Sequence, residues 1–119
     1  MPNITIYGIK NCDTMKKARD WLDAHKIPYT FHDYKTASIE QPLLEAWVKQ
    51  AGWEKLLNRA GTTFKKLPGE NKLDLDATKA IALMLAQPSM IKRPVLAIGS
   101  ELIIGFQPER YAAVFSAKT

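Results

Sequence analysis

The single cysteine, Cys12, is the residue with the clearest potential for chemistry. It stands just before a segment expected to form a helix, where free backbone N–H groups and the positive end of the helix dipole stabilise an anion. Lys10, Lys16 and Lys17 add positive charge, whereas the carboxylate of Asp13 competes for the same helix end. The thiolate is the reactive form of cysteine, so this position favours a nucleophile. The alternative is an inert, buried cysteine that packs as a small hydrophobic residue.

The residues around Cys12 also limit its redox chemistry. The segment Cys12-Asp13-Thr14-Met15 has the spacing of a C-x-x-C motif, with methionine in place of the second cysteine. Because the chain contains no other cysteine, Cys12 can form a disulfide only with another molecule. A redox role would therefore need an external thiol such as glutathione.

Two basic segments could bind an anion. Arg93-Pro94 directly precedes an apolar run expected to form a strand. Arg93 would there be a fixed cation for a thiolate or a bound oxyanion. Arg59 and the segment 61–66, which contains Lys65, could close over an anionic ligand. The alternatives are a surface arginine and a solvated loop, and the residue types alone leave both open.

Other sites are not expected. His25 and His32 lie seven positions apart, with no cysteine or carboxylate at ligand spacing, so we predict no metal site. The chain has no glycine-rich phosphate loop. We expect no binding to nucleic acid, because no recognised module or clustered basic stripe is present.

The composition is that of an ordinary globular protein, with 119 residues, 46% of them apolar and 24% charged. The 17 basic and 12 acidic residues give a net charge of +5, which permits an anionic ligand without requiring one. The first residues lack the pattern of a signal peptide, and no apolar run approaches the ~20 residues of a membrane span. We expect a cytoplasmic monomer without a membrane segment.

Apolar spacing predicts the elements that must position these residues. Residues 3–7 and 29–34 alternate as strands, and the helix between them, which ends near residue 24, has Met15, Ala18 and Leu22 on one face. A strand, a helix and a strand of these lengths form a right-handed βαβ unit.

The middle of the chain is predicted to be helical. One helix starts near residue 39 and ends at Gly52, and residues 61–69 form a loop. A second helix has Asp74 as its N-cap and ends before Pro88. Its predicted inner face contains Leu75, Thr78, Ala82 and Leu85.

Two apolar runs near the end of the chain, 95–98 and 102–104, predict a hairpin that turns at Gly99-Ser100. A last helix should turn Tyr111, Val114 and Phe115 inward. We therefore predict an α/β, thioredoxin-like fold with a four-stranded mixed sheet. It would form one domain over residues 1–119, with a helical insertion at about residues 36–92.

The segment 7–18 (YGIKNCDTMKKA) resembles the active-site loop of the arsenate reductase (ArsC)/Spx/YffB family, and most closely that of its YffB branch. Three further segments match the family in type and order. They are 61–67 (GTTFKKL), 91–96 (IKRPVL) and 105–109 (GFQPE). The resemblance therefore covers essentially the whole chain. It implies a thioredoxin-like fold with a cis-proline after Arg93, and Cys12 as the nucleophile.

In arsenate reductases of this family, the cysteine attacks arsenate held by arginines, and glutathione and glutaredoxin complete the reduction. The resemblance implies three such arginine positions in this chain. The first is an arginine here, Arg93, whereas the second is Lys65 and the third is Phe106. A lysine supplies charge without a bidentate fork, and a phenylalanine supplies neither, so arsenate is not the expected substrate. Met15 likewise excludes the C-x-x-C disulfide switch of many Spx proteins.

The resemblance favours a glutathione-dependent thiol–disulfide oxidoreductase. Cys12 and Arg93 would be catalytic, with glutathione as a co-substrate and no bound cofactor. Glutathionylated proteins or glutaredoxin are the expected partners. An Spx-like regulator that binds RNA polymerase, or an arsenate reductase with an altered pocket, are the alternatives. The expected glutathione-binding residues are Lys10, Asn11, Arg59, Lys65 and Pro94.

Overall fold

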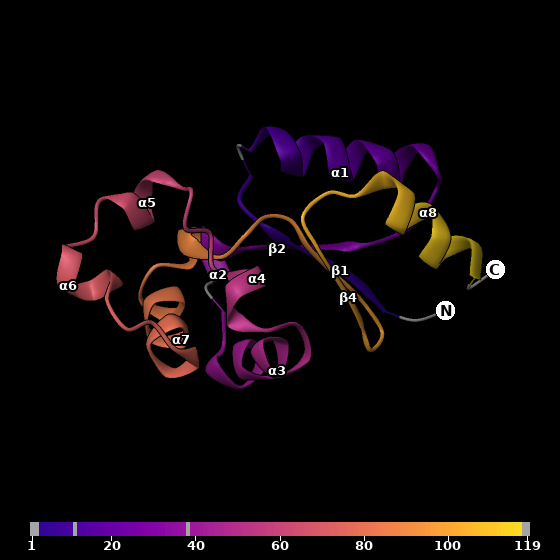
Figure 1. Cartoon of the computed structure of the whole chain (residues 1–119). Helices are drawn as coiled ribbons and strands as arrows, with labels where there is room; N and C mark the ends of the chain where they lie inside the picture. The colour runs from indigo at the N-terminus through magenta and orange to yellow at the C-terminus, as the bar shows by residue number, and fades with distance from the viewer. Residues whose placement is uncertain (1–2, 11, 38, 118–119) are drawn as a thin grey trace. The chain divides into compact units, whose positions relative to one another are not determined.

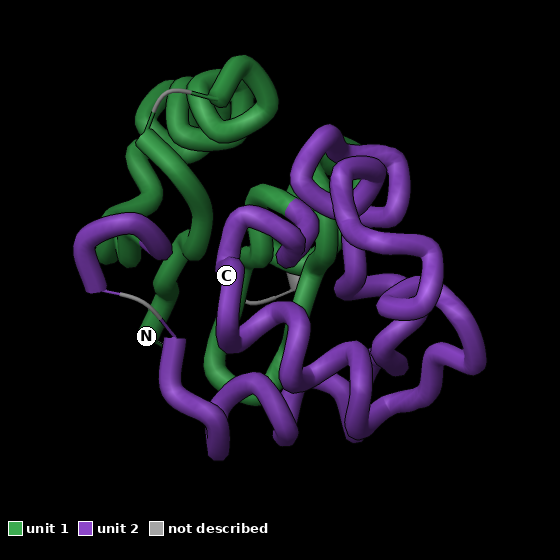
Figure 2. Tube along the Cα trace, turned by 90° about the vertical axis from the view of Figure 1, so that its left-hand side faces the viewer, with its two compact units in different colours: residues 1–33, 93–119 green, residues 34–92 purple. Residues whose placement is uncertain are grey.

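The computed structural model describes residues 3–10, 12–37 and 39–117. The chain divides into two compact units, which Figure 2 distinguishes by colour. The first unit joins residues 1–33 to residues 93–119, and the second is the segment 34–92 between them.

The first unit contains a four-stranded sheet in the order β2-β1-β3-β4. Its strands are β1 (Ile4–Gly8), β2 (Thr30–Asp33), β3 (Val95–Ile98) and β4 (Glu101–Ile104). β1 runs parallel to β2 and antiparallel to β3, and β3 pairs antiparallel with β4. Gly99 opens the β3–β4 turn with φ 57°, a conformation that glycine adopts without steric cost. This order confirms the predicted mixed, thioredoxin-like sheet.

Two helices, α1 (Asp13–Ala24) and α8 (Pro108–Ala117), pack against the sheet of this unit (Figure 1). The three α1 residues predicted to face inward are fully buried. Trp21 joins α1 to α8, because its ring lies 5.5 Å from the Tyr111 ring, edge to face. The hydrophobic core of the unit consists of Ile4, Ile6, Met15, Ala18, Leu22, Leu96, Ile98, Ile103 and Tyr111.

The end of α1 explains how the chain returns to the sheet. Lys26 adopts φ 57°, and its N–H donates to the carbonyl of Asp23. The N–H of Ile27 donates to the carbonyl of Leu22, which completes a Schellman motif. Pro28 then prevents any continuation of the helix, so the chain turns directly into β2.

The second unit is helical. It contains α2 (Tyr34–Ala37), α3 (Gln41–Ala51), α4 (Trp53–Leu56), α5 (Thr62–Lys65), α6 (Gly69–Lys72), α7 (Ala77–Ala86) and the 3₁₀ turn η1 (Pro88–Met90). α3 buries Leu44 and Trp47 and ends at Gly52, whose φ is 94°, as the sequence predicts. The N–H of Lys92 donates to the carbonyl of Leu56, and Leu57 forms a β-bridge with Ile91, so the end of the segment pairs with the residues that close α4.

Three sequence predictions are wrong in detail within this unit. The segment 61–69, predicted to be a loop, contains α5, which buries Phe64. The N-cap of α7 is Asp76, whose carboxylate accepts from the N–H of Lys79 at 2.8 Å, whereas Asp74 adopts φ 51° two residues earlier. The buried residues of α7 are Ala80 and Met84, so the buried face differs from the predicted one, which contained Ala82 and Leu85.

A helix long and apolar enough to cross a membrane is not found among the described residues.

Candidate active site

Cys12 is the N-cap residue of α1, four positions after β1 ends at Gly8. Its backbone is extended, with φ −127° and ψ 129°, and its carbonyl accepts the N–H of Lys16 at 2.9 Å. The helix therefore begins at the cysteine, and the first N–H groups of α1 surround the thiol. The thiol itself is half-buried and forms no disulfide.

Glycine at position 8 allows α1 to approach the sheet closely at this point. A Cβ at Gly8 would lie against Met15 Sδ and 2.7 Å from Met15 Cε. Met15 is fully buried and occupies the position of the second cysteine in a C-x-x-C motif. The methionine thus fills the space between the end of β1 and the first turn of α1.

The pairing of β1 with β3 brings Arg93 to the cysteine. Tyr7 lies opposite Val95 in the antiparallel register, so the residues before Val95 lie beside the residues after Tyr7. Arg93 forms a side-chain hydrogen bond with Cys12. The Arg93–Pro94 peptide bond is cis, as the family resemblance implies, and the carbonyl of Pro94 accepts the N–H of Gly105 at 2.8 Å.

These contacts change the pKa of the Cys12 thiol. Burial alone would raise the pKa of the thiol. Hydrogen bonds from the N–H of Met15, the side chain of Arg93 and the N–H of Thr14, together with the positive charge of Arg93, outweigh burial and lower the pKa below its ordinary value. Such an environment is typical of a reactive cysteine, and buried structural cysteines lack it.

The remaining candidate residues lie in different places. Lys10 is exposed and lines a pocket with Cys12, while Asn11 lies outside the described residues. Arg59 and Lys65 are exposed residues of the helical unit. The guanidinium of Arg59 lies 5.8 Å above the ring of Trp53.

Phe106 stands where the family resemblance places a third arginine. Its ring lies 5.2 Å from that of Tyr111, edge to face, and it packs against the hydrophobic core of the sheet unit. It therefore contributes apolar packing and supplies no donor for an oxyanion. Over the part of the chain that the structure describes, no group of three His, Cys, Asp or Glu residues could hold a metal ion.

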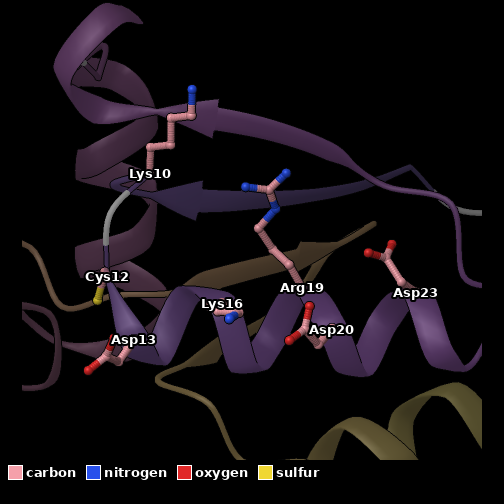
Figure 3. A pocket seen from close by; sticks show the side chains of 7 residues that line it. All are labelled: Lys10, Cys12, Asp13, Lys16, Arg19, Asp20 and Asp23. Carbon is pink, nitrogen blue, oxygen red and sulfur yellow. The ribbon is translucent and has the colours of Figure 1, made fainter.

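A pocket of about 420 Å³ opens beside Cys12 and runs along α1 (Figure 3). Its lining includes Arg19, Asp20 and Asp23, which the sequence analysis did not single out. A signal was present, since positions 12, 16, 19 and 23 follow the i+3/i+4 spacing of one helix face. The pocket is lined by Lys10, Cys12, Asp13, Lys16, Arg19, Asp20 and Asp23.

The family model described as the ArsC family matches residues 7–114, which is most of the chain and includes both Cys12 and Arg93. The chain belongs to the ArsC family. This finding confirms the resemblance drawn from the residues around these two positions.

Three similar proteins illustrate the range of ArsC relatives. A solved structure called the YFFB protein is 59% identical, with a TM-score of 0.91 over 93% of this chain and 97% of that one. An arsenate reductase (ArsC) related protein from Brucella melitensis is 57% identical, with a TM-score of 0.76 over 95% and 94%. The global transcriptional regulator Spx 2 of Lactococcus lactis is 28% identical, over 92% of this chain and 84% of the regulator.

Proposed function

We propose that the protein is a glutathione-dependent thiol–disulfide oxidoreductase in which Cys12 is the nucleophile. The observation that carries the proposal is the thiol at the start of α1, with a pKa lowered by Met15, Arg93 and Thr14 against the effect of burial. The thiolate is the form that attacks a disulfide sulfur, so a lowered pKa raises the reactive fraction of the cysteine. Membership of the ArsC family, together with a 57% identical relative called an arsenate reductase (ArsC) related protein, supports thiol chemistry at this position.

The reaction has two exchange steps. In the first, the Cys12 thiolate attacks the glutathione sulfur of a glutathionylated substrate, and the S–S bond breaks. The substrate leaves as a thiolate and takes up a proton, while Cys12 holds the glutathionyl group as a mixed disulfide. In the second, the thiolate of a free glutathione attacks that glutathionyl sulfur, which releases oxidised glutathione and the Cys12 thiolate. In the net exchange the substrate sulfur is reduced from disulfide to thiol, and the sulfur of the one free glutathione is oxidised from thiol to disulfide.

Arg93 contributes to both steps. It stabilises the Cys12 thiolate before attack, which raises the fraction of enzyme in the reactive form. It also stabilises the same thiolate as the leaving group of the second step, and thiols of lower pKa leave faster. Because the chain has no second cysteine, the resolving thiol must come from outside.

We further propose that Lys10 and the backbone at Pro94 bind the glutathionyl group. Lys10 lines the pocket beside Cys12 and carries a positive charge suited to a carboxylate. Asn11, Arg59 and Lys65 stay predictions of the sequence. Glutathionylated proteins and glutaredoxin are the partners that this chemistry would use.

The test is turnover of a glutathionylated peptide with glutathione. The turnover is measured as NADPH consumption by added glutathione reductase, which reduces the oxidised glutathione formed. Cys12→Ser should abolish turnover while the circular dichroism spectrum stays unchanged. Arg93→Ala should reduce turnover, whereas Arg110→Ala, an exposed change on α8, should not. Turnover retained by Cys12→Ser would reject the mechanism.

A second candidate function is that of an Spx-like regulator that binds RNA polymerase without catalysis. It is supported by relatives such as the global transcriptional regulator Spx 2, whose sequence aligns with 92% of this chain. A pull-down with purified RNA polymerase distinguishes this candidate. Binding that survives Cys12→Ser, in a protein without turnover, would favour the regulator.

A third candidate is arsenate reduction. The edge-to-face packing of Phe106 on Tyr111 argues against it, because the side chain at that position cannot bind an oxyanion. The assay is oxidation of glutathione that depends on added arsenate. Turnover with arsenate that exceeds turnover with the glutathionylated peptide would favour this candidate over the first.

A further inference from the structure

The pocket beside Cys12 is lined by charges of both signs. Three cations, Lys10, Lys16 and Arg19, and three carboxylates surround it together with the cysteine (Figure 3). Residues 13, 16, 20 and 23 follow the spacing of neighbours on one helix face, and this face is opposite the buried one. A ligand that enters this pocket beside the thiol therefore meets positive and negative groups along α1.

Arg19 is held in place by the sheet. Its Nε donates to the hydroxyl of Tyr29 at 3.2 Å, and its guanidinium carbon lies 4.6 Å above the ring of Phe31. Figure 3 shows the side chain pointing away from α1 toward the strands. A cation fixed by such contacts loses little conformational entropy when it binds a carboxylate, because its orientation is already set.

The charges of the pocket do not neutralise one another. An ordinary solvated helix face would pair residues three or four positions apart, such as Asp13 with Lys16 or Arg19 with Asp23. Within the described ranges 3–10, 12–37 and 39–117, the six charged side chains form no ion pair. They are therefore available to a ligand that carries both a carboxylate and an ammonium group.

We infer that this pocket binds the γ-glutamyl end of the glutathionyl group, with Arg19 on its α-carboxylate and Asp20 and Asp23 near its ammonium. This inference rests on the proposed function and assigns the specificity of the same site. The γ-glutamyl end carries a carboxylate and an ammonium on one carbon, which matches an arginine flanked by carboxylates. Arg19 is thus a specificity-determining residue that leaves the sulfur chemistry to Cys12 and Arg93.

The spacing along α1 suits this ligand. Cys12 and Arg19 are seven positions apart, about 10 Å along the helix axis. The side chain of Arg19 leans toward the helix N-terminus, which shortens the distance to the thiol. From its centre to one end an extended tripeptide spans about 5 Å, and the side chains of Cys12 and Arg19 cover the remaining distance between the sulfur and the guanidinium.

The experiment titrates isotopically labelled protein with S-methylglutathione, which cannot react with Cys12, and follows the amide signals by NMR. The wild type should show shifts along α1 and at residues 29–31, and Arg19→Gln should bind about tenfold more weakly. Arg19→Lys keeps the positive charge and loses the bidentate guanidinium, so its affinity should lie between those of the wild type and Arg19→Gln. Arg110→Gln, an exposed arginine of α8, is the matched control and should bind as the wild type does.

A second arm tests the acidic residues. The wild type should prefer S-methylglutathione over its analogue without the α-amino group, and Asp20→Asn with Asp23→Asn should abolish that preference. Equal binding by wild type and Arg19→Gln, or no binding by the wild type, would overturn the inference. Neither result decides the thiol chemistry of Cys12, which would still stand if glutathione-dependent turnover requires Cys12 and would fall if Cys12→Ser retains it.

Discussion

Replacing Gly8 with alanine tests how closely the first turn of α1 must approach the end of β1. The new methyl group would lie 2.7 Å from Cε and 3.0 Å from Cγ of Met15. Carbon atoms pack best at about 3.5–4.0 Å, so the methionine would have to move. Met15 has no exposed surface and lies in the core of the sheet unit, so it would displace its neighbours as well.

The magnitude follows from core substitutions of this kind. Overpacking by one methyl group costs about 1–3 kcal/mol of unfolding free energy, and we expect about 2 kcal/mol for Gly8→Ala. For a protein of this size that lowers Tm by about 8 °C. Met15→Ala alone should cost about 2–5 kcal/mol through the cavity that it leaves. The double variant should be more stable, by at least ~0.5 kcal/mol, than the sum of the losses in the two single variants predicts. The reason is that the methyl group introduced by Gly8→Ala occupies part of the cavity left by Met15→Ala.

Urea unfolding, followed by tryptophan fluorescence, measures all four proteins of this cycle. Gly69→Ala is the matched control, because a Cβ there has no atom within 4 Å, and it should change stability by less than ~0.5 kcal/mol. Additive effects of Gly8→Ala and Met15→Ala would show that the two positions do not compete for space. That result would refute the reasoning about the approach of α1 to the sheet.

Three further predictions concern other parts of the chain. Because the pKa of folded Cys12 is lowered, its contribution to stability is complete above the ~8.5 of an unfolded cysteine and is lost as pH falls through the folded pKa. Urea titrations at several pH values across that window should show that the unfolding free energy of the wild type falls as pH falls. Cys12→Ser should not show this fall. Asp76→Ala should cost about 1 kcal/mol in urea unfolding through loss of the α7 N-cap, whereas Asp74→Gly should be neutral or stabilising. Burial raises the pKa of Tyr111, whose hydroxyl lacks a hydrogen-bond partner in the described structure. Tyr111→Phe should therefore leave Tm unchanged or raise it, and a clear loss would reveal a hydrogen bond.

Much of the sheet unit is predictable from local patterns. The alternation in β1 and the helical spacing of Met15, Ala18 and Leu22 each indicate one element, and the structure agrees with both. The place of Cys12 before α1 follows from the same boundaries. The proximity of Arg93 to Cys12 also follows, once β1 and β3 are assigned as antiparallel neighbours.

The rest depends on contacts that local patterns do not contain. α7 is apolar at most of its positions, so its sequence does not specify which face is buried. α5 has only four residues and buries Phe64, and so short a helix depends on packing that a sequence does not display. The position of the Arg19 side chain is not predictable from local patterns, because it depends on Tyr29 and Phe31, which the fold brings to it.

The central claim is that Cys12 is an activated thiolate, and the ultraviolet absorbance of the thiolate, titrated against pH, tests it most directly. The account predicts a Cys12 pKa below the ordinary ~8.5 in the wild type and a higher pKa in Arg93→Ala. Arg110→Ala should leave the titration unchanged, since this residue lies on α8 away from the thiol contacts. A wild-type pKa at or above ~8.5 that does not respond to Arg93→Ala would contradict the account.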